Sequence, residues 1–120
     1  PGLNEDLLDI QKNYTDKGGM FWLAIDEHDR VIGSVGVSIM ENEIECYIHR
    51  LFIKYNQKHK GIGTELLSTA EAYAIKKGKI ATIVHLGKSK EQWFEAWAFY
   101  PKHGYVEIED NIMRKELKKL

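Results

Sequence analysis

The chain alternates between short apolar runs and polar turns, a pattern that indicates a sheet with a few helices. Runs rich in β-branched and aromatic residues, bounded by turn-forming residues, predict strands. These strands are expected at Met20–Ile25, Arg30–Met40, Ile44–Tyr55, Lys79–Leu86, Tyr105–Glu109 and Ile112–Leu117. The turn Asp26–Asp29 is short and polar, so the first two strands are expected to pair antiparallel, and the third strand follows after the turn Glu41–Glu43.

Apolar residues spaced three or four apart predict three helices. In the first, Leu7, Ile10 and Tyr14 form one apolar face, and a glycine pair ends the helix. The helices are expected from Asn4 to the pair Gly18-Gly19, from Ile62 to Gly78 and from about Lys90 to Lys102.

The second predicted helix joins two apolar strands, which indicates a right-handed crossover between parallel neighbours. We therefore expect an α/β fold: a mixed, mostly antiparallel sheet that is split at a parallel βαβ crossover, with helices on both faces. Residues 1–120 are enough for one such domain and too few for two.

The composition adds little that is specific. With 43% hydrophobic and 29% charged residues, the chain resembles an ordinary soluble domain. A net charge of −1 argues against nucleic-acid binding, which normally requires a basic surface. No apolar run approaches the roughly 18–20 residues that cross a bilayer, so no membrane partner is expected. Cys46 is the only cysteine, which excludes an internal disulfide and fits a cytoplasmic location.

The clearest chemistry lies where the strand ending near Tyr55 leads into the helix beginning at Ile62. A basic loop with Gly61 and Gly63 precedes a helix N-terminus, whose unpaired N–H groups and partial positive charge bind anions. The glycines let a phosphate reach the backbone without meeting a Cβ. The dinucleotide fingerprint is excluded because Leu66 replaces its third glycine, and the P-loop sequence Gly-Lys-Ser/Thr is absent.

Two motifs carry a family resemblance. The first is the turn Lys58-x-x-Gly61-x-Gly63, and the second is the segment Ala96–Val106, AWAFYPKHGYV. They resemble the pyrophosphate signature Arg/Gln-x-x-Gly-x-Gly/Ala and the Ala-x-x-Phe-Tyr-x-x-x-Gly-Phe segment of the GNAT superfamily of N-acetyltransferases. Lysine stands where arginine or glutamine is usual. The resemblance extends from about Met20 to Leu117.

The resemblance implies that acetyl-CoA is the co-substrate and that no metal is needed. The turn would hold the pyrophosphate, and pantetheine would pair with the main chain of a strand that splays from its parallel neighbour. The cofactor-binding residues implied are Leu51, Phe52, Ile53, Lys58, His59, Lys60, Gly61, Ile62, Gly63 and Thr64. Tyr100 matches the tyrosine that protonates the departing thiolate, although a tyrosine there can also simply cap a packed helix end.

The chain departs from the family pattern in two places. Trp93 stands where the family often has an asparagine that bonds the cofactor. Only one predicted helix precedes Met20, whereas the family usually opens with a strand and two helices, so these N-terminal elements are expected to be shortened. The strand at Met20 would then be an exposed edge, which invites pairing with another chain and makes a homodimer one expectation.

A base that accepts the proton of the incoming ammonium is expected on the strand 44–55. Alternation places Glu45, Tyr47 and His49 on one face and Cys46 on the other. Glu45 and His49 both remain candidates for the base, the alternative being a solvated carboxylate or a hydrogen-bonded histidine. Because Cys46 and His49 point to opposite faces, the pair is not expected to bind a metal.

The leading hypothesis is therefore an N-acetyltransferase that moves acetyl from acetyl-CoA to a primary amine by direct attack in a ternary complex. The acceptor, a small molecule or a peptide, stays open. An alternative is a non-catalytic module that binds acyl-CoA as a sensor or partner domain. A third reading, a generic phosphate-binding or structural domain, predicts no affinity for CoA.

Overall fold

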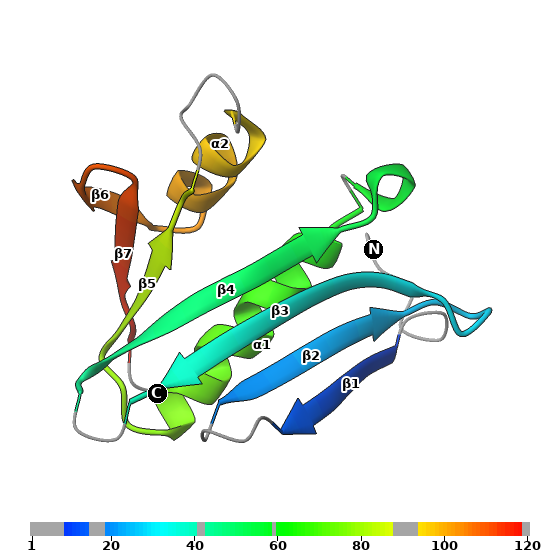
Figure 1. The fold of residues 1–120 in the computed structure, drawn as a ribbon, viewed down its shortest axis with the longest axis horizontal. Helices are drawn as coiled ribbons and strands as arrows, with labels where there is room; N and C mark the ends of the chain where they lie inside the picture. Colours follow the sequence, from blue (N-terminus) through cyan, green and yellow to red (C-terminus); the bar gives the residue numbers. More distant parts are fainter. Residues whose placement is uncertain (1–8, 15–18, 41–42, 59, 88–93, 119–120) are drawn as a thin grey trace.

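The computed structural model describes residues 9–14, 19–40, 43–58, 60–87 and 94–118. They form a seven-stranded mixed sheet and two α-helices (Figure 1). The elements are β1 (Asp9–Tyr14), β2 (Met20–Ile25), β3 (Val31–Ile39), β4 (Glu45–Ile53), a short 3₁₀ turn (Tyr55–Gln57), α1 (Ile62–Lys76), β5 (Ala81–His85), α2 (Phe94–Lys102), β6 (Val106–Glu109) and β7 (Ile112–Glu116). The strand order is β1-β2-β3-β4-β5-β7-β6.

The expected mixed sheet with one parallel crossover is confirmed. β4 and β5 pair in parallel across α1, and the other neighbouring strands described pair antiparallel. Strands β2 to β7 and both helices lie where the apolar pattern predicts them, with ends shifted by a few residues. The pattern succeeds for β2, β3, β4 and α1 because each has a regular buried face, whereas β5 is buried almost throughout and β6 is exposed along its length.

The first predicted helix is wrong over residues 9–14, the only part of it between Asn4 and Lys17 that the structure describes. Asp9–Tyr14 is a strand that pairs antiparallel with β2, from Asp9 opposite Ile25 to Tyr14 opposite Met20. Consequently β2 is not the exposed edge that the sequence suggested. The apolar residues of this segment have helical spacing, but a short helix is only marginally stable by itself. The edge of β2 offers hydrogen-bond partners for the backbone along its whole length, so the segment pairs with it as a strand.

The hydrophobic core lies between the sheet and α1. From the sheet, Trp22 and Val35 are buried, and α1 contributes Leu66, Leu67 and Ala70. These residues follow the alternation of strands and the three-to-four spacing of a helix, so one face of each element supplies the core.

α2 joins the same core beside α1. The Tyr105 hydroxyl donates to Glu71 of α1 at 2.8 Å and lies 2.7 Å from the hydroxyl of Thr82 in β5. The ring of Tyr105 packs edge-on against Tyr100 of α2, with centroids 5.3 Å apart. Burial, followed by the charge of Glu71, raises the pKa of Tyr105 far above its ordinary value. This network fixes α2 relative to α1, and both described helices therefore pack on one face of the sheet.

Candidate active site

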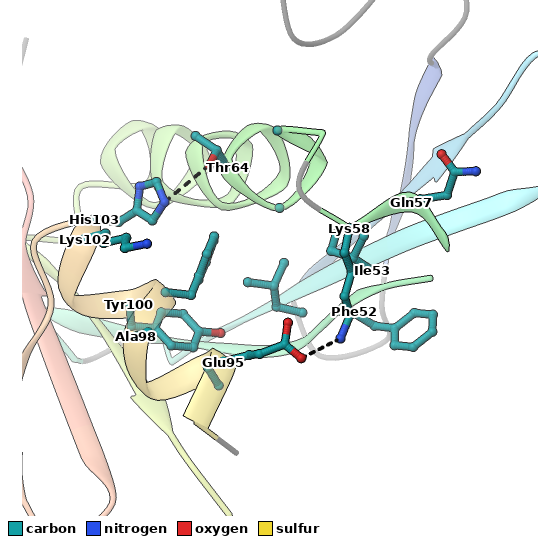
Figure 2. A pocket seen from close by; sticks show the side chains of 15 residues that line it. Phe52, Ile53, Gln57, Lys58, Thr64, Glu95, Ala98, Tyr100, Lys102 and His103 are labelled. Carbon is teal, nitrogen blue, oxygen red and sulfur yellow. Dashed lines mark hydrogen bonds and ion pairs between the residues drawn. The ribbon is translucent and has the colours of Figure 1, made fainter. Parts of the chain in front are cut away.

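A cleft of about 710 Å³ opens where β4, the start of α1 and α2 approach one another (Figure 2). Its walls combine apolar strand residues with polar and aromatic helix residues. They include Leu51, Phe52 and Ile53 of β4, Gly61, Gly63 and Thr64 around the start of α1, and Glu95, Phe99, Tyr100, Lys102 and His103 in or just after α2. A volume of this size suits a ligand larger than a simple metabolite.

A β-bulge in β4 shapes one wall of the cleft. Gly36 of β3 lies opposite His49, but Ser34 lies opposite Phe52, so one residue of β3 faces two of β4. Arg50 sits in this bulge with a φ of 55°, and its carbonyl accepts a 2.8 Å hydrogen bond from the Ser34 hydroxyl. The strand alternation predicted from the sequence therefore holds only up to His49.

The bulge directs the next residues of β4 toward the cleft. Leu51 and Ile53 now pack against the core on the α1 face, while Phe52 lies 58% exposed on the other side. Without the extra residue, Phe52 would take the α1 face in their place.

Along the cleft, the main chain of β4 pairs with β3 but has no described partner on its β5 side. Pairing with β5 ends at Ile48 opposite Val84, although β4 continues to Ile53, and the two strands diverge from this point (Figure 1). The Lys54 N–H donates to a β3 carbonyl at 2.8 Å. Since backbone groups alternate along a strand, those of Leu51 and Ile53 point away from β3, where no described strand meets them.

The turn from Lys58 to Gly63, the phosphate turn, has the geometry expected of an anion site. Gly61 is the residue before α1 and has a φ of 83°, a left-handed conformation that favours glycine. Ile62, Gly63 and Thr64 form the first turn, whose N–H groups have no partner within the helix. Lys60 is exposed and donates to Gln57 at 3.3 Å. The remaining basic residue proposed for this turn, His59, lies outside the described residues.

The two glycines of the turn have different reasons to be glycine. A side chain at Gly61 would be strained by the backbone itself. A Cβ built on Gly63 would lie 3.4 Å from the ring of Phe99 and 3.6 Å from Ile53, both of which line the cleft. Gly63 therefore keeps space free inside the cleft, with no demand on its φ.

Two polar contacts cross the cleft between the region of α1 and α2. The Lys58 ammonium donates to Glu95 at 3.3 Å, and Thr64 lies 3.3 Å from the Nε2 of His103 (Figure 2). No sequence motif predicted Glu95, Lys102 or His103 as residues of this site. A helical wheel could have found Glu95 and Lys102, because with Phe99 they follow the i, i+4, i+7 spacing of one helix face.

Tyr100 is buried in the wall of the cleft, and its hydroxyl points into the open space (Figure 2). Its ring packs edge-on against Phe99 and Tyr105, each with centroids 5.3 Å apart. Burial raises the pKa of Tyr100 well above its ordinary value of 10.0, so the phenol stays protonated at neutral pH.

His49 lies on the sheet face opposite α1, just before the bulge. Its Nε2 is 2.9 Å from the hydroxyl of Ser38. The ring occupies the space above Gly36, where an added Cβ would lie 2.5 Å from the imidazole Cε1. Burial, and then the charge of Arg50, lowers the pKa of His49 below its ordinary value of 6.5. The imidazole is therefore neutral at pH 7 and able to accept a proton.

Glu45 shares the face of His49 but is engaged elsewhere. Its carboxylate accepts a hydrogen bond from Arg114 of β7, which also reaches Glu116 at 3.5 Å. Between Glu45 and His49 along β4, the ring of Tyr47 packs at a tilt of 54° against His85 of β5, with centroids 5.7 Å apart. No local pattern pointed to Arg114, which is 69 residues from Glu45 in the sequence.

The remaining sequence predictions concern Trp93, Cys46, metal binding and membrane spans. Trp93 lies outside the described residues. Cys46 is buried on the α1 face, where burial raises the pKa of its thiol to about 11. Among the residues that the structure describes, no group of three or more His, Cys, Asp and Glu side chains could hold a metal ion. None of the described helices is long and apolar enough to cross a membrane.

Comparison with known proteins gives one family. The model that represents the acetyltransferase (GNAT) family matches residues 2–105. A search of curated proteins by sequence finds no match. A GNAT-family acetyltransferase from Staphylococcus aureus shares the fold with a TM-score of 0.76 and 22% identity, over 88% of this chain and 72% of its own.

Two further structures similar to this chain contain a bound coenzyme. The PaiA N-acetyltransferase of Thermoplasma acidophilum, in complex with coenzyme A, is 28% identical with a TM-score of 0.70, over 82% of this chain and 60% of its own. A GNAT-family acetyltransferase from Elizabethkingia anophelis with acetyl-CoA bound is 16% identical with a TM-score of 0.75, over 93% of this chain and 99% of its own.

Proposed function

Because the chain belongs to the acetyltransferase (GNAT) family, whose model covers residues 2–105, we propose that it transfers acetyl from acetyl-CoA to a primary amine. The observation that carries this proposal is the convergence of three features in one cleft. These are the unpaired main chain of β4, the N-terminus of α1 and the hydroxyl of Tyr100. An acyl-CoA requires all three: a partner for pantetheine, a site for the diphosphate and a proton donor at the sulfur.

The residues of the cleft fit acetyl-CoA as co-substrate. The N–H groups of Ile62, Gly63 and Thr64 would bind the diphosphate, with the helix dipole favouring its charge. The backbone of Leu51 and Ile53 would pair with the pantetheine amides as a further strand does. The two structural neighbours with coenzyme A or acetyl-CoA bound support this assignment.

Direct attack requires the ammonium to lose two protons and the thiolate to gain one. The amine nitrogen forms the new C–N bond as the C–S bond breaks, and the thiolate takes a proton from Tyr100. The acylated nitrogen then gives up its remaining extra proton to the Tyr100 phenolate, which leaves a neutral amide and restores the phenol. His49 does not line the cleft, so in this proposal the amine approaches from the opposite face of the sheet, where the neutral imidazole beside the bulge takes the proton that the attacking ammonium must lose. Glu45 remains the second candidate for the base, and its ion pair with Arg114 disfavours it.

A thiol-release assay tests the proposal. Acetyl-CoA is supplied with a panel of amines that includes diamines, amino acids and lysine peptides, and calorimetry with CoA is run alongside. We expect CoA binding and release of thiol with at least one class of amine. Binding without turnover would instead support the alternative, an acyl-CoA sensor or partner module, which the ion pairing of Glu45 favours. A failure to bind CoA would contradict both.

The first prediction concerns the diphosphate site. Replacing Gly63 by valine should raise the Kd for CoA about 10-fold or more, because its branched side chain enters the space between Ile53 and Phe99. Calorimetry measures the Kd, and thermal melting should change little, since Gly63 lies in a helix and needs no left-handed φ.

Gly63→Ala is the matched control, because its single methyl would make ordinary contacts and should retain most of the affinity. Gly61 is less useful for this test, since its left-handed φ would strain any other residue and confuse binding with stability. Unchanged CoA affinity in a folded Gly63→Val protein would remove the basis for placing the diphosphate at α1.

The second prediction concerns the support of His49. Gly36→Ala adds a methyl that would lie 2.5 Å from the imidazole, so the ring must move. A displaced catalytic group lowers the rate steeply, and we expect kcat/KM for the amine to fall roughly 10-fold or more. The Kd for CoA should stay unchanged because Gly36 lies on the opposite face from the cleft. An equal loss of CoA affinity would show a general disturbance of the sheet instead.

A further inference from the structure

The walls of the cleft are joined by an ion pair. The Nζ of Lys58, in the turn before α1, lies 3.3 Å from the Oε1 of Glu95, in the first turn of α2 (Figure 2). The two residues are 37 positions apart in the sequence, and both line the cleft. The pair therefore spans the region between the diphosphate turn and the helix that carries Tyr100.

The exposure of this pair argues that it does not serve to hold the fold together. The side chains of Lys58 and Glu95 are 34% and 50% exposed, and ion pairs of this exposure contribute little to stability. The buried network around Tyr105 already fixes α2 against α1. What the pair does change is the availability of Lys58, the basic residue of the turn that carries the family signature.

We propose that Glu95 sets the affinity of the cleft for its cofactor by competing with the diphosphate for Lys58. This inference rests on the proposed function, because it takes an acyl-CoA as the ligand. A carboxylate and a phosphate both accept charge-assisted hydrogen bonds from an ammonium group. The ammonium carries a single positive charge, so the diphosphate must share Lys58 with Glu95 or displace it, and in both cases the negative charge of Glu95 remains in the same cleft.

The competition has a consequence for specificity. It weakens every ligand that uses a diphosphate by about the same factor, including free nucleotides. An acyl-CoA compensates through its pantetheine, which pairs with the free edge of β4 beside Leu51 and Ile53. Glu95 thus makes binding depend on the part of the cofactor that carries the acyl group, and it is a specificity-determining residue rather than a catalytic one.

The test compares ligands with and without phosphate on the wild type and Glu95→Gln. Calorimetry with CoA and ADP should show a Kd about 3- to 5-fold lower in Glu95→Gln, the range expected for an exposed ion pair. Pantetheine, measured by competition, lacks phosphate and should bind both proteins equally. A merely structural role for Glu95 would change all three ligands together, and thermal melting checks that the variant is folded.

Two further variants locate the cause of the gain. Glu65→Gln is the matched control, because Glu65 is an exposed carboxylate in the first turn of α1 that does not line the cleft. It should leave the Kd for CoA nearly unchanged. In a Lys58→Met background, Glu95→Gln should give little gain, since no cation is left to compete for.

Different experimental outcomes would contradict the competition for Lys58 and the proposed acyltransferase function. Wild-type CoA binding that does not tighten in Glu95→Gln would overturn the competition and leave the acyltransferase assignment intact. A gain that persists in full without Lys58 would also overturn it, because simple repulsion by Glu95 would then be the cause. Absence of CoA binding by the wild type would contradict the proposed function, and this inference with it.

Discussion

Replacing His49 by glutamine is expected to lower kcat at pH 7 by a factor on the order of 10²–10⁴, the usual contribution of a general base. The imidazole has its pKa lowered below 6.5 by burial and by the charge of Arg50. The imidazole therefore loses its proton below pH 6.5, and at any higher pH it can act as a base. The acid limb of the kcat profile should lie below pH 6.5 in the wild type and should be lost in His49→Gln.

Glu45→Gln is the control for this prediction, since Glu45 shares the sheet face of His49 but is ion-paired with Arg114. We expect this variant to keep the acid limb and most of the activity. Loss of the limb in Glu45→Gln alone would transfer the role of base to Glu45. If both variants keep the wild-type profile, either another group is the base or the amine loses its proton in solution before it binds.

Tyr100→Phe is expected to lower kcat roughly 100-fold or more while leaving the Kd for CoA close to the wild-type value. The change removes the hydroxyl that points into the cleft and keeps the ring that packs against Phe99 and Tyr105. Burial raises the pKa of Tyr100, so the wild-type phenol carries its proton throughout the neutral range. Steady-state kinetics, calorimetry with CoA and thermal melting measure the three quantities separately.

Tyr105→Phe provides the matched comparison, because the two tyrosines contact each other but only Tyr100 lines the cleft. The Tyr105 hydroxyl bonds with Thr82 and Glu71, so its loss should cost about 1–3 kcal/mol of stability with little effect on kcat. Early melting or lost CoA binding in Tyr100→Phe would assign Tyr100 a structural role. Normal turnover would mean that the thiolate leaves without help from Tyr100.

Much of the fold could be predicted because its elements have regular buried faces. The apolar runs located β2 to β7, and the strand–helix–strand order required a parallel crossover between β4 and β5. The anion turn was also visible, since a helix start and the two glycines Gly61 and Gly63 lie within a few residues of one another. Local sequence is sufficient wherever the physical cause is local.

Neither the bulge in β4 nor the strand β1 could be predicted from local sequence patterns. The bulge at Arg50 depends on a hydrogen bond from Ser34 and on the register with β3, which alternation along β4 alone does not contain. Asp9–Tyr14 became a strand because the edge of β2 was free to pair with it, whatever its own helical spacing. In both cases the deciding partner lies on another strand.

By itself, then, the sequence determined the order of the elements, the crossover and the position of the phosphate turn, all of which follow from periodicity and glycine within short stretches. Only the tertiary structure decided the state of the candidate site. It paired Glu45 with Arg114 and Lys58 with Glu95, and it placed His49 over Gly36. Whether a side chain acts as a base, forms an ion pair or has no role depends on the groups that folding places beside it. In this protein those groups come from distant parts of the chain.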